Sequence, residues 1–205
     1  DFTDSSSSGA RSFIPVNETR DHIHFQMVGD YGLFSDPPTE ANNYKIAQVM
    51  SKVAQEDSVD FLVAAGDNFY SPSGINSTDD PRIKTRTDIT YNQPGIADKP
   101  WYFVLGNHDC DGNPEDEIAL NGKVSNWNFP SSYYSKTFSI DSKGNKALFL
   151  FLDGCLLTWM AADEETKKTF SFTPTEEAIE TQTRWIKDTL ENAAKDDTIV
   201  WRSIV

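Results

Sequence analysis

Residues 60–67 read DFLVAAGD, an apolar run that stops at a glycine followed by an aspartate. A continuous apolar run of this kind is typical of a strand that is buried on both faces of a parallel sheet. Residues 22–30 (HIHFQMVGD) and residues 101–109 (WYFVLGNHD) also pass from a strand pattern into glycine and a polar residue. These three stretches decide the fold that the sequence predicts.

Between the first two of these strands, apolar residues recur at helical spacing after a pair of prolines, which predicts a helix over residues 39–53. Those apolar residues are Ile46, Val49, Met50 and Val53. A shorter helix is predicted around residues 82–87, before the third strand. Strands that alternate with helices favour a parallel sheet with helices on its faces.

The second half of the sequence has a different pattern. Residues 133–140 and 147–153 are predicted to be two strands of a meander, joined by a polar turn. A further apolar pattern over residues 198–205 predicts one more strand. These strands imply a mixed or second sheet, and the expected fold class is α/β.

The clearest helix is predicted over residues 175–194. Thr173 or Thr175 can cap its first turn, and two glutamates follow at positions that the helix dipole favours. Its predicted buried stripe consists of Ile179, Trp185, Ile186 and Leu190.

Composition limits the possible functions. The 205 residues are 38% hydrophobic and 12% aromatic, which is enough apolar material for a folded core. The formal net charge of -14 disfavours a nucleic-acid partner, because the chain repels the phosphate backbone. No apolar run is long enough to predict a membrane span.

Polar residues follow each of the three apolar strands. In an open α/β sheet the carboxyl ends of the strands share one edge, so Asp30, Asp67, Tyr70, Asn107 and His108 are expected to converge there. A single Gly-Asp pair is most often an ordinary turn, whereas three such strand ends in one chain favour a site. This oxygen-rich set with a nearby imidazole suits Fe, Mn, Zn or Mg.

The same three strand ends resemble the first three signature blocks of the metallophosphoesterases: residues 29–32 (GDYG), 66–70 (GDNFY) and 106–109 (GNHD). Most of that superfamily has Asp-x-His in the first block. This sequence has Asp30-x-Gly32 and a tyrosine three residues after Asp67, which resembles the purple acid phosphatases.

Later stretches extend the resemblance to roughly residues 23–205 and to the small, single-domain, tartrate-resistant type. They are NWNFP at 126–130, FLFLD at 149–153 and the pattern Gln182-x-x-Trp185-Ile186. The implied fold is a metallophosphoesterase-like βαβ sandwich of two mixed sheets flanked by helices. We expect residues 1–20 to form a flexible arm and residues 21–205 to form the metallophosphoesterase domain, without its C-terminal part.

The resemblance also implies roles for individual residues. Asp30 and Tyr70 would bind a ferric ion, Asp67 would bridge two ions, and Asn107 would bind the second ion, which is Fe(II), Zn or Mn. His108 would be a catalytic residue that contacts the phosphate or the leaving group. The implied activity is hydrolysis of phosphomonoesters by an acid phosphatase, in which a metal-bound hydroxide attacks phosphorus.

The sequence departs from the family in its histidines. Two further blocks of the family supply three histidine ligands, whereas the histidines here are His22, His24 and His108. We therefore expect that the chain is C-terminally truncated and that residues 1–205 alone are inactive. Two alternatives stay open: a non-catalytic scaffold that kept the fold, and a metal-dependent phosphodiesterase or nucleotidase of the wider superfamily. Intact ligand positions disfavour the scaffold, and the Gly32–Tyr70 pair disfavours the phosphodiesterase.

Cysteines and sequons bear on localisation. Cys110 and Cys155 can be two free thiols or one disulfide, and the sequence leaves this open. Asn17 and Asn76 begin two N-x-S/T sequons, which lean toward a secreted protein or one in the lysosomal or vacuolar lumen. The expected protein is a monomer whose partner is a phosphate-ester substrate.

Overall fold

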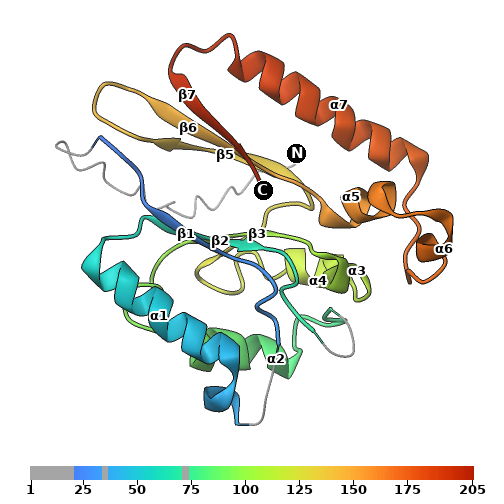
Figure 1. Ribbon diagram of the computed structural model, residues 1–205, viewed down its shortest axis with the longest axis horizontal. Helices are drawn as coiled ribbons and strands as arrows, with labels where there is room; N and C mark the ends of the chain where they lie inside the picture. Colours follow the sequence, from blue (N-terminus) through green and yellow to red (C-terminus); the bar gives the residue numbers. More distant parts are fainter. Residues whose placement is uncertain (1–20, 34–36, 71–73) are drawn as a thin grey trace, which may run out of the picture.

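Two β-sheets form the framework of the protein in a computed structural model that describes residues 21–33, 37–70 and 74–205 (Figure 1). The expected N-terminal arm and Asn17 lie outside the described residues. The strands of the first sheet are β1 (Phe25–Val28), β2 (Phe61–Ala65), β3 (Trp101–Val104) and β4 (Trp127–Asn128). Those of the second sheet are β5 (Tyr134–Ser139), β6 (Lys146–Phe151) and β7 (Ile199–Ile204).

The two sheets differ in strand direction. The first has the order β1-β2-β3-β4, and all its neighbouring strands are parallel. In the second, β5 pairs with β6 antiparallel and β6 pairs with β7 parallel. The expected sandwich of two sheets is therefore present, but only the second sheet is mixed. The first is parallel because helical crossovers return each strand of β1 to β3 to the same edge.

Seven α-helices and two other helical segments are present in the described residues. They are α1 (Asn42–Glu56), α2 (Pro81–Lys84), α3 (Asn107–Cys110), α4 (Pro114–Ile118), α5 (Gly154–Ala161), α6 (Glu164–Lys167) and α7 (Glu176–Ala193), with a 3-10 turn η1 (Pro38–Glu40) and a π-helical segment η2 (Thr85–Thr90). The helices predicted over 39–53, 82–87 and 175–194 are confirmed. The short helices α3 to α6 and strand β4 were not predicted from the sequence.

The elements stack as helix, sheet, sheet and helix, with α1 and α2 outside the first sheet and α7 outside the second (Figure 1). Alternate residues of β2 face different layers, as a strand requires. Phe61 and Val63 pack against Phe149 and Phe151 of the second sheet, whereas Leu62 belongs to the core on the α1 side. The unbroken apolar run of β2 is explained by these two buried faces.

Helices α1 and α7 use their apolar residues differently. Trp185, Ile186 and Leu190 of α7 pack on β6, and Thr175 caps the helix by accepting a hydrogen bond from the main-chain N–H of Ala178. In α1 only Met50 of the four apolar residues that predict the helix is buried; the others are exposed. The small residues Ala47, Ser51 and Ala54 line the buried face of α1 instead.

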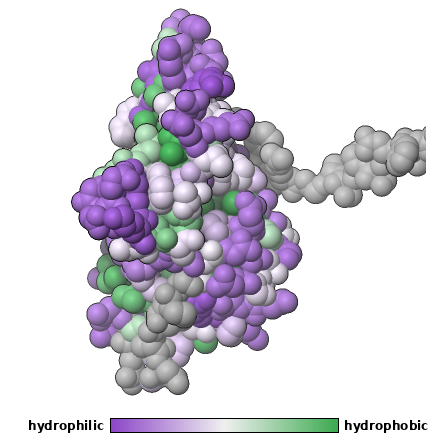
Figure 2. Space-filling view, turned by 90° about the vertical axis from the view of Figure 1, so that its right-hand side faces the viewer, coloured by the Kyte–Doolittle hydropathy of each residue, from purple (hydrophilic) through white to green (hydrophobic). Residues whose placement is uncertain are grey.

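On the face shown in Figure 2 hydrophilic residues predominate, and hydrophobic residues occur in small groups. Within the described ranges, we find no helix with the length and apolar character needed to cross a membrane.

Candidate metal centre

The loops that follow β1, β2 and β3 are joined to one another at the carboxyl edge of the first sheet. The main-chain N–H of Gly32 donates to the Asp67 carbonyl oxygen (3.0 Å), and the N–H of Tyr70 donates to the Gly32 carbonyl oxygen (3.3 Å). The main-chain N–H of His108 donates to Asp67 Oδ1 (3.1 Å). The expected convergence of the three strand ends is therefore observed.

Three oxygen-bearing side chains meet in this position. The Tyr70 hydroxyl lies 2.7 Å from Asp30 Oδ1 and 2.5 Å from Asp67 Oδ2. Burial and hydrogen bonding to the two carboxylates raise the pKa of Tyr70 far above its usual range. A hard cation at the same point would reverse this effect, because it stabilises a phenolate and both carboxylates together. The three donors thus have the chemistry that a hard cation requires.

The main chain is strained at the two carboxylates. Asp30 (φ 52°) and Asp67 (φ 54°) are the residues other than glycine that adopt a left-handed conformation in the described ranges. Aspartate tolerates this region better than most residues, but the conformation still has a cost, and it persists only where surrounding contacts enforce it. Backbone strain of this kind gathers at functional sites.

Two glycines allow the loops to approach so closely. A Cβ atom on Gly32 would lie 2.5 Å from main-chain atoms of Asn68 and Phe69. A Cβ atom on Gly106 would lie 2.2 Å from Asp67 Oδ1. No side chain fits at Gly32, so the histidine that most of the superfamily carries in the first block has no room in this arrangement.

The third loop carries Asn107 and His108 at the start of α3. The His108 ring is half-buried, and its centroid lies 4.3 Å from that of the Tyr70 ring. The structure therefore brings Asp30, Asp67, Tyr70 and His108 together. The Asn107 side chain is exposed beside them and forms no hydrogen bond with the described residues.

Within the described residues, no three His, Cys, Asp or Glu side chains are grouped so that they could hold a metal ion. The predicted set contains only two carboxylates, Asp30 and Asp67. Its other two members, Tyr70 and Asn107, offer a phenol and an amide.

Beneath the loops lies a buried polar cluster that sequence reasoning missed. The Asp109 carboxylate accepts hydrogen bonds from the main-chain N–H groups of Asn68 (3.0 Å), Phe69 (3.0 Å) and Gly106 (2.8 Å). Glu117 is fully buried and accepts from the Asn68 amide (3.1 Å). Asn68 lies inside the second signature block, and this position could have identified it as part of the site. Glu117 gave none, because it stands in an acidic run that resembles a solvated helix face.

The cluster is electrostatically unusual. Burial raises the pKa of Glu117 well above its usual range, and burial also raises the pKa of Asp109. Arg86 is buried beside them, and desolvation lowers its pKa to about 9. Its guanidinium stacks over the Tyr31 ring at 3.8 Å. These three titratable groups are thus buried beneath the loops that follow β1, β2 and β3.

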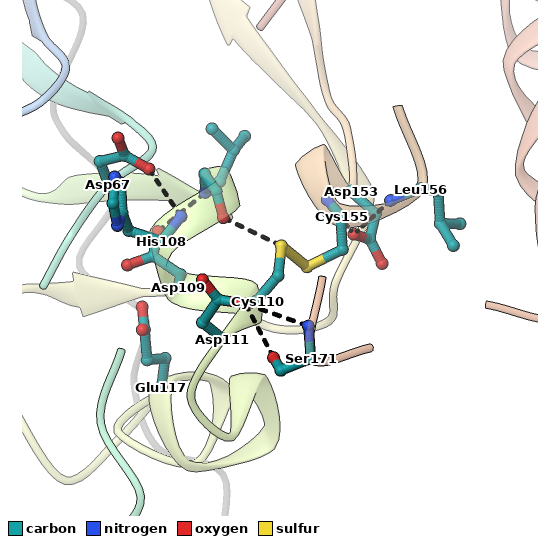
Figure 3. Close-up of a disulfide and its surroundings, with 12 residues drawn as sticks. Asp67, His108, Asp109, Cys110, Asp111, Glu117, Asp153, Cys155, Leu156 and Ser171 are labelled. Carbon is teal, nitrogen blue, oxygen red and sulfur yellow. Dashed lines mark hydrogen bonds between the residues drawn. A yellow bond between two sulfur atoms is a disulfide. The ribbon is translucent and has the colours of Figure 1, made fainter. Parts of the chain in front are cut away.

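A disulfide closes the other side of the third loop. Cys110 of α3 is bonded to Cys155 of α5, with Cα atoms 5.6 Å apart (Figure 3). Asp111 accepts hydrogen bonds from the Ser171 main-chain N–H and hydroxyl, which draws the chain beyond α6 to the same loop. This pairing answers the question that the sequence left open. A cavity of about 300 Å³ lies beside the disulfide.

The described fold is that of a family of phosphoesterases. Residues 23–202 match the calcineurin-like phosphoesterases, and the chain belongs to that family. Within it, the chain is homologous to tartrate-resistant and purple acid phosphatases.

Two relatives illustrate the homology. Tartrate-resistant acid phosphatase type 5 of Oryctolagus cuniculus is 31% identical over 182 residues, which are 87% of this chain and 54% of the relative. Purple acid phosphatase 4 of Arabidopsis thaliana is 27% identical over 189 residues, which are 89% of this chain and 50% of the relative. The chain thus spans about half the length of the curated relatives it matches.

Proposed function

We propose that the gene product containing this chain is an acid phosphatase that hydrolyses phosphomonoesters at a binuclear centre of Fe(III) and a divalent ion, Fe(II), Zn or Mn. In this proposal Asp30 and Tyr70 bind the ferric ion, Asp67 bridges both ions, and Asn107 binds the divalent ion. When bound, the two ions supply Lewis acidity toward the phosphate ester.

The main support is the approach of the Tyr70 hydroxyl to both carboxylates, at 2.7 Å from Asp30 and 2.5 Å from Asp67. A phenol has one proton and can donate it to only one of the two carboxylates at a time, whereas a bound cation would be shared by all three oxygens. Phenolate and carboxylate are hard donors, which favours Fe(III) over a soft metal.

His108 is proposed to act on the substrate. Its imidazole lies beside Tyr70 and is partly open to solvent, so it can reach a phosphate ester bound at the same edge. There it can donate a hydrogen bond to the phosphate or a proton to the departing oxygen.

The second ion, the localisation and the oligomeric state complete the proposal. The described residues offer only Asp67 and Asn107 to the second ion, so we expect residues 1–205 alone to retain it weakly and to be inactive. The disulfide and the exposed sequon at Asn76 support a secreted or lumenal glycoprotein. We expect a monomer.

Tyr70→Phe in the full-length gene product tests the proposal. We expect wild-type protein to contain iron, to absorb visible light through the tyrosinate and to hydrolyse p-nitrophenyl phosphate at acidic pH. Tyr70→Phe should lose the visible absorption together with most of the activity. Tyr133→Phe is the matched control, because Tyr133 packs on Trp185 of α7.

Three outcomes would contradict parts of the proposal. Wild-type protein that contains two metal ions but is colourless would remove Tyr70 from the ligand set. A preference for bis-p-nitrophenyl phosphate would favour the phosphodiesterase alternative. Folded wild-type protein that takes up no metal would favour the non-catalytic scaffold.

A further inference from the structure

A hydrogen bond joins the two residues that directly follow the proposed carboxylate ligands Asp30 and Asp67. Tyr31 follows Asp30, and Asn68 follows Asp67. The Tyr31 hydroxyl donates to Asn68 Oδ1 at 2.8 Å. Tyr31 is 2% exposed and Asn68 is 0% exposed. A buried side-chain bond therefore joins the first and second loops directly behind the two carboxylates.

Asn68 uses its other polar atoms to reach two more parts of the fold. Its side-chain amide donates to the Val104 carbonyl oxygen (2.8 Å) and to Glu117 Oε2 (3.1 Å). Its main-chain N–H donates to Asp109, and its carbonyl oxygen accepts from Arg86 Nη1 (2.7 Å). An asparagine amide with both its donor and its acceptor engaged has one allowed orientation.

We propose that Tyr31, Asn68, Asp109 and Glu117 are positioning residues that hold Asp30 and Asp67 at the separation that a shared metal site requires. We call these four residues the Asn68 bracket. The physical need for it is the left-handed main chain at both aspartates, which relaxes unless its surroundings fix it. The part of the inference that concerns metal rests on the proposed function.

Tyr91 distinguishes positioning from ordinary core packing. It is 5% exposed, its ring meets the Tyr31 ring edge to face at 5.4 Å, and both tyrosines lie against Arg86. The Tyr91 hydroxyl, however, has no hydrogen-bond partner among the described residues. Tyr31→Phe and Tyr91→Phe thus remove the same atom from neighbouring buried rings, and only the first breaks the Asn68 bracket.

The first arm of the experiment needs no metal. Amide hydrogen exchange is measured over residues 29–33 and 66–70 in metal-free wild-type protein and in both variants. We expect Tyr31→Phe to exchange about fivefold faster in these segments, as the loss of one buried hydrogen bond implies. Tyr91→Phe should match wild type there.

The second arm uses metal-loaded protein and a chelator. Tyr31→Phe should release the metal about fivefold faster than wild type and shift the visible absorption maximum, whereas Tyr91→Phe should do neither. Asn68→Ala, which removes all three side-chain bonds, should exceed Tyr31→Phe in both arms if it folds.

The outcomes separate the two proposals. Equal exchange in Tyr31→Phe and wild type, or equal acceleration in both tyrosine variants, overturns the Asn68 bracket whether or not metal binds. Wild-type protein that binds no metal overturns the proposed function and the metal part of the inference, while the exchange arm still decides whether the four residues position the loops.

Discussion

His108 contacts the site in two separate ways, through its main chain and through its ring. Its N–H donates to Asp67 Oδ1, and its ring lies 4.3 Å from that of Tyr70. The first contact supports a proposed ligand and does not depend on the side chain. The second is the one available to a substrate.

His108→Ala is therefore expected to retain both metal ions and lose turnover. The alanine keeps the main-chain N–H that supports Asp67, and a positioned general acid or hydrogen-bond donor contributes about 10²–10⁴-fold to the rate. Metal analysis and steady-state kinetics check this, with kcat falling more than KM rises. Asp67→Asn is the contrasting variant, since it should lose metal and activity together. Release of metal from His108→Ala would make the imidazole a ligand.

At the scale of elements, α3 is a four-residue helix that depends on its neighbours. Asp109 binds it to the second loop from one side, and the disulfide binds it to α5 from the other. A helix this short has almost no intrinsic stability, so these two attachments fix the loop that carries Asn107 and His108.

Replacing both cysteines tests the second attachment. The double variant Cys110→Ser and Cys155→Ser should lower the free energy of unfolding by about 2–4 kcal/mol. The disulfide restricts the unfolded chain, and its loss returns that conformational entropy to the unfolded state. Urea denaturation measures the change, and wild-type protein treated with a reductant should show the same loss. Two thiols that react with an alkylating agent in folded, untreated protein would mean that the bond is absent.

At the scale of the whole molecule, the sandwich buries acidic groups in a chain whose formal net charge is -14. Asp109 and Glu117 are buried in the core beneath the loops that follow β1, β2 and β3. Their raised pKa values mean that the folded state binds protons more tightly than the unfolded state does.

The stability of metal-free protein should therefore decrease as the pH rises. Because the folded state binds these protons more tightly, protonation contributes its full stabilisation below the ordinary carboxyl pKa of about 4. This contribution is lost as the pH rises through the pKa of the folded state, which is about 6 for Asp109 and well above the usual range for Glu117. Chemical denaturation at about pH 5 and about pH 8 measures it. Glu117→Gln should flatten the difference, because it removes one of the two titrating groups. An equal slope in the variant would show that Glu117 does not contribute to the pH dependence.

Local sequence patterns were sufficient for the longer strands and helices and for the polar residues that follow three of the strands. The apolar run of residues 60–65 predicted β2, and the helical spacing of residues 175–194 predicted α7, because strands and helices impose their own periods on neighbouring residues. Parallel strands share a carboxyl edge, so Asp30, Asp67 and Tyr70 could be expected to meet there before any coordinates were known.

Other features were decided only by the tertiary structure. The Cys110–Cys155 bond spans 45 residues, and the hydrogen bond from Asn68 to Glu117 spans 49. No local period encodes such pairs. The buried face of α1 was likewise set by the sheet on which it packs, which accepts Ala47 and Ala54 and leaves Val49 in solvent. The sequence by itself thus determined the strands other than β4, and which polar residues follow β1, β2 and β3. Long-range packing determined the bonds that hold those residues in place, because their partners become neighbours only when the layers assemble.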